Sequence, residues 1–221
     1  MMSMQPVLEI RATDGFTLWP TSDHGPYGSL PLHGKLTPAE VGTALWQLAD
    51  LNDVELSPEE AAERGPRPED PLGAFLHGLL TDPGPYAPGG LWVTDPATGT
   101  VFEPGCCTGL GEWRGWLDVT DGGGTAWFGH DPDARAEYVG RVVRLTQDAE
   151  DPGSAVIELP PAELRRLLAD AERDLRDFLD LAARWAERHL PDHAAALTAA
   201  IARALDLDPE PAPAPAPEPP A

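Results

Sequence analysis

The sequence is poor in cationic residues, and lysine is nearly absent from it. Its 221 residues include 37 acidic side chains against 15 Lys and Arg, Lys35 is the only lysine, and the formal net charge is −22. Residues 208–221 hold only Asp208, Glu210 and Glu218 among these acids, so the acidity belongs to the rest of the chain. Such a field repels phosphate backbones and attracts basic partners. We therefore expect no nucleic-acid binding; solubility is the simplest use of this charge, and a basic protein is the partner that it favours.

Long hydrophobic runs and spaced cysteines are also missing. No segment approaches the ~20 apolar residues of a membrane span, so no membrane contact is expected. Met1 to Pro6 carries no charged leader and no long apolar run follows it, which argues against a secretory signal. The two cysteines are adjacent, and two adjacent cysteines do not make a disulfide framework. These absences predict a cytoplasmic protein.

The composition itself has a recognisable bias. Ala, Pro, Gly and Asp are abundant and Arg replaces Lys, which resembles the proteins of high-GC actinobacteria. This resemblance concerns composition and assigns no family. After Leu207 the chain alternates Pro, Ala and Glu, so residues 208–221 are predicted to be a disordered, polyproline-like tail.

Helix start signals are clear at several positions. Thr37-Pro38-Ala39-Glu40 and Ser57-Pro58-Glu59-Glu60 each combine a capping residue, a proline and a glutamate. A third helix is predicted from Asp70-Pro71, the longest from Pro160-Pro161 to about His189, and a last one from Pro191 to about Leu205.

Extended segments fill much of the rest. Strands are predicted at 7–10, 16–19, 91–94, 100–102, 116–119, 125–128, 137–146 and 154–159. Helices early and late with strands between them predict one α+β domain over residues 1–207, in which the long helix covers an antiparallel sheet.

The cysteine pair lies in the most unusual segment, Gly105 to Trp116. A reactive thiol needs a lowered pKa, for which Arg114 or a short helix beginning near Leu110 is a candidate cause. A disulfide between neighbours is strained, because Cα atoms ~3.8 Å apart lie below the usual span of ~4.4–6.8 Å. The simpler interpretation is that Cys106 and Cys107 are two small, part-buried residues of a tight loop.

Two tryptophans follow the cysteines at a spacing of three. Trp113 and Trp116 share one face of a helical turn, with Glu112 and Arg114 beside them. This arrangement suits an aromatic platform for a ligand or a partner. More often, however, such tryptophans simply fill a hydrophobic core.

His130 is the best acid or base candidate, because an imidazole titrates near neutral pH. Together with Cys106 or Cys107 it can bind a metal, although the spaced pairs of a zinc site are missing. Three carboxylates lie nearby in the sequence, namely Asp131, Asp133 and Glu137. They could bind a hard cation weakly, or they could simply be the acidic residues of an ordinary turn.

No catalytic pattern emerges, and no cofactor is predicted. The leading hypothesis is a non-enzymatic interaction module for a basic protein, similar to immunity or antitoxin proteins in charge alone. The first alternative is a small-molecule-binding or enzymatic domain with a pocket lined by Cys106, Cys107, Trp113, Trp116 and His130. The second alternative is a metal-dependent thiol sensor.

Overall fold

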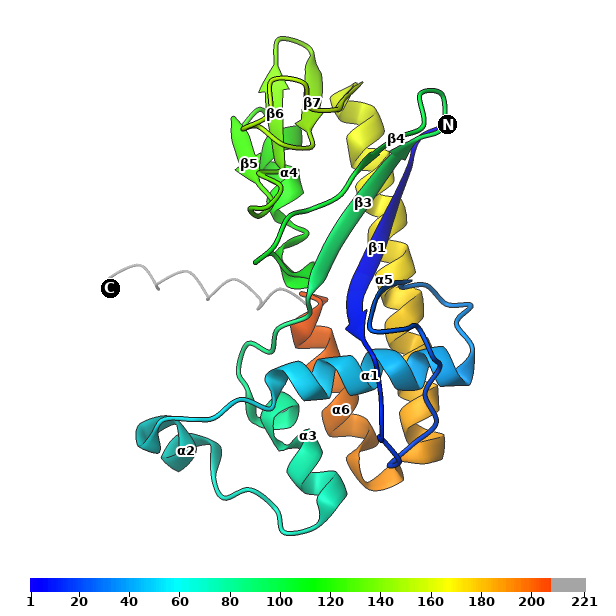
Figure 1. Cartoon of the computed structure of the whole chain (residues 1–221), viewed down its shortest axis with the longest axis vertical. Coiled ribbons are helices and arrows are strands. Elements are labelled where there is room, and N and C mark those ends of the chain that lie inside the picture. Colours follow the sequence, from blue (N-terminus) through cyan, green and yellow to red (C-terminus); the bar gives the residue numbers. More distant parts are fainter. Residues whose placement is uncertain (208–221) are drawn as a thin grey trace, which may run out of the picture.

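A computed structural model describes residues 1–207, and the predicted tail at 208–221 lies outside the described residues. The fold is α+β, as the element order predicts (Figure 1). The helices are α1 (Pro38–Asn52), α2 (Pro58–Arg64), α3 (Pro71–Thr81), α4 (Gly115–Thr120), α5 (Pro161–His189) and α6 (Ala194–Ala204), with 3-10 turns at Leu110–Glu112 and Pro191–His193. The strands are β1 (Ser3–Arg11), β2 (Tyr27–Pro31), β3 (Gly89–Asp95), β4 (Thr100–Phe102), β5 (Thr125–Trp127), β6 (Arg135–Val139), β7 (Val142–Thr146) and β8 (Val156–Leu159).

The two predicted capping boxes are both present. The Thr37 hydroxyl accepts from the Glu40 backbone, and the Glu40 carboxylate accepts from the Thr37 backbone at 2.7 Å. Ser57 and Glu60 repeat the arrangement at α2. A proline follows each cap, where its missing N–H costs nothing. The local sequence therefore determines where α1 and α2 begin.

The strands form two antiparallel sheets rather than one. The first has the order β2-β1-β3-β4, and the second has the order β5-β6-β7-β8. In β1 the side chains alternate, so that Leu8 and Ile10 are buried while Glu9 and Arg11 are exposed. One face of the first sheet thus packs on the core, and part of the other remains open to solvent.

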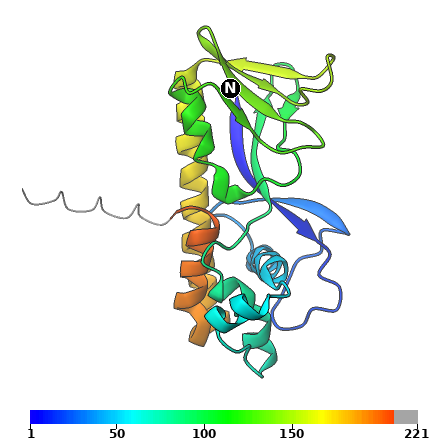
Figure 2. The same cartoon turned by 90° about the vertical axis from the view of Figure 1, so that its left-hand side faces the viewer.

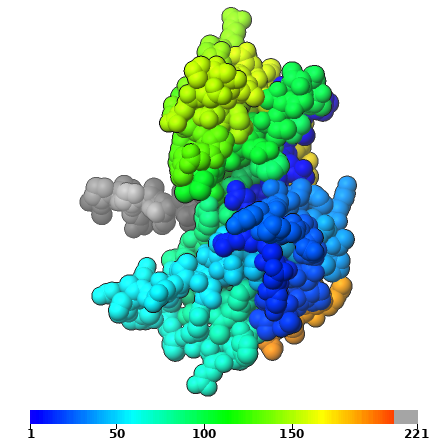
Figure 3. Space-filling model, viewed as in Figure 1, coloured from blue at the N-terminus to red at the C-terminus, as the bar shows by residue number. Residues whose placement is uncertain are grey.

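Helix α5 runs along both parts of the molecule (Figures 1 and 2). Its apolar stripe packs against β1, α1, α4 and α6. Trp185 also donates from its indole to the Pro38 carbonyl at 2.8 Å, which ties α5 to the start of α1. The space-filling view shows the second sheet in one lobe and α1 to α3 in the other (Figure 3). None of the helices in residues 1–207 combines the length and the apolar character needed to cross a bilayer.

Several element predictions were wrong. Residues 116–119 belong to α4 rather than to a strand, because Trp116 and Val119 bury one face of a helical turn. Residues 137–146 are not one strand but parts of the hairpin β6-β7, which turns at Gly140 with φ 65°. Residues 16–19 form no strand, since the Phe16 and Trp19 rings pack 4.7 Å apart in the core instead. Strand β2 lies at Tyr27–Pro31, where no strand was predicted.

Candidate functional site

Two chain segments cross at Gly105 and Gly129. Cys106 donates its backbone N–H to the His130 carbonyl at 2.7 Å, and His130 donates back to the Cys106 carbonyl at 3.1 Å. A Cβ on Gly105 would clash with the Pro132 oxygen, and one on Gly129 would lie 2.5 Å from Gly105. Only glycine permits this approach, and the crossing is what places the cysteines beside His130.

The side chains of Cys106, Cys107 and His130 form a compact cluster. The two Sγ atoms are 3.4 Å apart, and one ligand atom from each of the three residues lies within 4.8 Å of the others. All three are exposed, and both thiols are free. Cys107 has φ 70°, an uncommon conformation for a residue with a side chain. The cluster brings together two soft ligands and an imidazole, whereas the simpler interpretation predicted part-buried cysteines.

Hydrogen bonding sets the electrostatics of the cluster. Hydrogen bonds from Cys106 and then from His130 lower the pKa of the Cys107 thiol. The pKa of Cys106 is raised, mainly by its hydrogen bond with Cys107. The Asp131 carboxylate lies 3.0 Å from Nδ1 of His130 and, with Cys107, raises the pKa of the imidazole. The contact with His130 therefore favours the thiolate form of Cys107.

Below the cluster lies an aromatic core. The ring of Trp116 stacks on Phe128 at 4.1 Å and meets Phe102 edge-on at 5.6 Å. Trp113 is also buried and donates from its indole to the Leu205 carbonyl at 3.0 Å. The two tryptophans thus support the crossing from the inside and offer no exposed platform.

Arg114 and Glu112, the polar neighbours of Trp113, interact with other residues than the two cysteines. Arg114 covers the Trp113 ring at 4.5 Å and forms an ion pair with Asp206 at 2.6 Å. It thereby fastens the end of the described chain to the core. Glu112 is exposed, and its negative charge contributes to the raised pKa of Tyr86.

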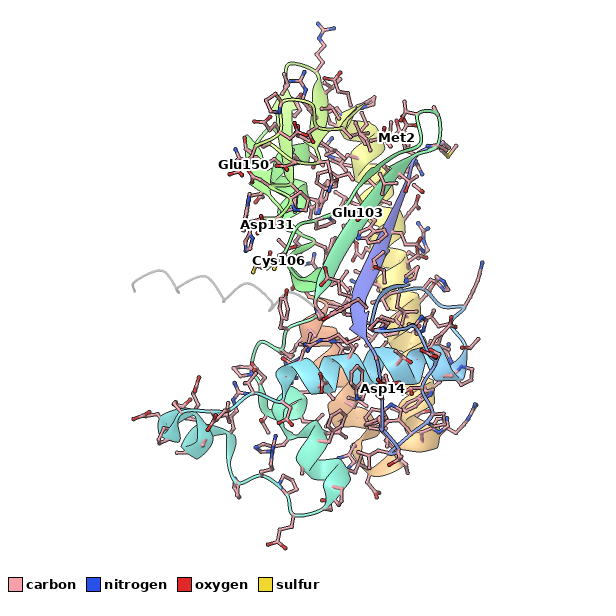
Figure 4. All side chains as sticks on the ribbon, in the orientation of Figure 1. Met2, Asp14, Glu103, Cys106, Asp131 and Glu150 are labelled. Atoms are coloured by element: carbon pink, nitrogen blue, oxygen red, sulfur yellow. The ribbon has the colours of Figure 1, made fainter. Side chains whose placement is uncertain are left out.

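A groove of about 610 Å³ extends from the cysteines along the open face of the first sheet. We call it the acidic aromatic groove. Its exposed or half-buried side chains include aromatic rings and carboxylates, among them Glu9, Tyr27, Tyr86, Trp92 and Glu103. In the side-chain view, Cys106 and Asp131 lie close to each other, and Glu103 lies just after β4 (Figure 4).

The pKa of Tyr86 responds to the acidic residues around this groove. Burial raises its pKa to about 12, and the negative charges of Glu9, Cys107, Glu112 and Cys106 contribute to this rise. Its hydroxyl donates to the Thr108 carbonyl at 2.6 Å, so the ring is fixed at the edge of the groove. The carboxylates of Glu9 and Glu112 act on the ring, and such carboxylates favour a positively charged ligand.

The remaining carboxylates near His130 do not join the cluster. Asp133 is occupied by Arg135 and by the indole of Trp127, which donates to it at 2.8 Å. A smaller hollow of about 270 Å³ lies beside His130 and Asp131 and is lined by further acids, including Asp148 and Glu150. Among residues 1–207, the only group of His, Cys and acids close enough to hold a metal is the cysteine and histidine cluster.

Sequence reasoning named the cluster and missed the groove. It placed Cys106 or Cys107 with His130 as candidate metal ligands, and the structure brings these three together while Trp113 and Trp116 lie in the core. The groove residues come from β1, β2 and β3 and from the loops beside them. The alternation of Glu9 and Arg11 with Leu8 and Ile10 was the available signal, since it marks a half-open strand.

Comparison of the chain with protein-family models, with curated proteins and with solved structures finds no match. The chemistry of its side chains indicates what the site can bind. The groove offers carboxylates and aromatic faces, which bind cations. The cluster offers thiolates and an imidazole, which bind thiophilic metals.

Proposed function

We propose that the protein is a non-enzymatic interaction module for a basic protein partner, and that a cationic segment of this partner docks in the acidic aromatic groove. The observation that carries this proposal is the placement of carboxylates beside open aromatic rings on one sheet face. Arginine is the side chain that exploits both, since its guanidinium pairs with carboxylates and stacks on aromatic rings.

Exposure of the aromatic rings supports docking. Tyr27 is 83% exposed and Tyr86 is 42% exposed, although both are large side chains. Tyrosine and tryptophan are enriched among residues that dominate binding energy at protein interfaces. A partner that covers these rings removes from water apolar surface that folding leaves exposed, and this burial favours binding.

Charge supports a cationic occupant. Glu9 and Glu103 line the groove together with a single cation, Arg11. The net charge of −22 adds a long-range field that speeds the encounter with a basic protein. Free thiols at the end of the groove suit a reducing compartment such as the cytoplasm.

The first test separates the groove from overall charge. A fluorescent arginine-rich peptide is titrated with the full chain, and its anisotropy gives the dissociation constant. The double variant Glu9→Gln with Glu103→Gln is expected to weaken binding by about tenfold, which corresponds to about 1.4 kcal/mol. Higher salt weakens binding to both proteins, because the attraction is electrostatic.

A matched control removes the same charge elsewhere. Glu59 and Glu63 are exposed on α2 and do not line the groove. The double variant Glu59→Gln with Glu63→Gln is expected to change the dissociation constant less than about twofold. Equal weakening by the two double variants would show that the peptide senses net charge alone, and the groove proposal would fall.

A second measurement asks for the natural partner. The chain is used to retain proteins from its native host at low and at moderate salt. The proposal expects a stoichiometric basic protein that the groove double variant no longer retains and the α2 double variant still does. Retention that is independent of the groove residues contradicts it.

A further inference from the structure

We propose that Cys106, Cys107 and His130 bind one thiophilic divalent cation of the zinc class, with a fourth coordination position left to water. The juxtaposition of two free thiols and an imidazole within 4.8 Å carries the proposal. Thiolate and imidazole are the ligands that zinc takes in proteins, and three protein ligands leave one position open. This inference does not rest on the proposed docking function.

The distances suit a tetrahedral ion. Zinc–sulfur bonds of ~2.3 Å place two sulfur ligands ~3.8 Å apart in a tetrahedron. The Sγ atoms of Cys106 and Cys107 are 3.4 Å apart, so they need to separate only slightly. Because all three side chains are exposed, they can close around an ion by rotating, without disturbing the core.

Asp131 supplies the outer contact that metal-binding histidines usually have. Its carboxylate lies 3.0 Å from Nδ1 of His130. Such a contact holds the proton on that nitrogen, orients the ring and leaves Nε2 as the metal ligand. Asp131 is thus a positioning residue in this proposal.

The backbone holds the ligands in place before any ion binds. Cys106 and His130 are joined by a reciprocal pair of backbone hydrogen bonds. The tight approach of Gly105 and Gly129 and the stacked pair of Trp116 and Phe128 fix the two segments that carry the ligands. Little order has to be created on binding, which favours affinity.

The test is a titration of the reduced, chelator-treated full chain. Zn²⁺ alone is added in a calorimeter, and Co²⁺ is added in a parallel absorption experiment. We expect one ion per chain, release of protons as the thiols ionise, and a thiolate-to-cobalt charge-transfer band. Cys106→Ser, Cys107→Ser and His130→Gln are each expected to weaken Zn²⁺ binding at least tenfold. Asp131→Asn is expected to weaken it by about 10- to 100-fold.

His193→Gln is the matched control, since His193 lies at the start of α6, outside the cluster, and should leave the affinity unchanged. Thermal unfolding without metal checks that each variant is folded; the exposed positions of the ligands predict nearly unchanged midpoints. The proposal is overturned if wild type and the ligand variants bind Zn²⁺ equally. It is also overturned if bound Co²⁺ shows no thiolate band.

Discussion

Replacing Gly129 by alanine is expected to lower the free energy of unfolding by about 2–5 kcal/mol, the sum of backbone strain and overpacking. Gly129 has φ 99°, where a residue with a side chain is strained. Its Cβ would also lie 2.5 Å from the carbonyl of Gly105. Relief of this clash pushes the segments apart, so His130 moves away from Cys106. Urea denaturation measures the stability.

The control for Gly129→Ala is unusually close. Gly124 has φ 100°, but nothing lies within 4 Å of the position that a Cβ would take there, so Gly124→Ala adds strain without a clash. It is expected to cost about 1–2 kcal/mol and to leave Zn²⁺ binding unchanged. If both alanine variants lose equal stability, close packing at the crossing is not what Gly129 provides.

Trp116→Ala is expected to destabilise the fold by about 3–5 kcal/mol, because it removes a large side chain from a filled core. Trp116 is 1% exposed and packs against the rings of both Phe128 and Phe102. The loss is expected to weaken the crossing as well, since Phe128 directly precedes Gly129. Chemical denaturation measures the free energy of unfolding. If the alanine variant does not fold, Trp116→Phe provides a milder change, because it leaves a smaller cavity and is expected to cost less than Trp116→Ala.

Trp127→Ala is the comparison for Trp116→Ala. Trp127 is 51% exposed on β5, and its indole donates to Asp133. Its loss is expected to cost about 0.5–1.5 kcal/mol, the range for one hydrogen bond. A cost for Trp116→Ala no greater than that for Trp127→Ala would contradict the role of the aromatic core beneath the cluster.

Local signals predicted much of the secondary structure. The caps at Thr37 and Ser57 and the apolar stripe of the long helix depend on residues three or four apart, and the structure confirms them. The strand predicted at residues 116–119 was wrong because an apolar run this short fits a strand and a helical turn equally well. Strand β2 was missed because its pairing with β1 involves residues distant in the chain.

The site was only partly predictable for the same reason. Cysteines and a histidine are conspicuous in sequence, so the candidate ligands were found. Their approach depends on a bridge between Cys106 and His130 that no local pattern encodes. The acidic aromatic groove combines Glu9, Tyr27 and Tyr86 from three separate segments. Pairing of β1 with β2 brings the first two together, and hydrogen bonds to Asn52 and Thr108 place Tyr86.

The most direct test of the docking claim uses the cysteines as reporters, because Cys106 and Cys107 line the groove. The alkylation rate of each thiol is measured by mass spectrometry in metal-free protein, with and without a saturating arginine-rich peptide. Binding in the groove predicts that both rates fall in proportion to the fraction of protein with peptide bound. Unchanged rates, while anisotropy shows the peptide to be bound, would contradict the account.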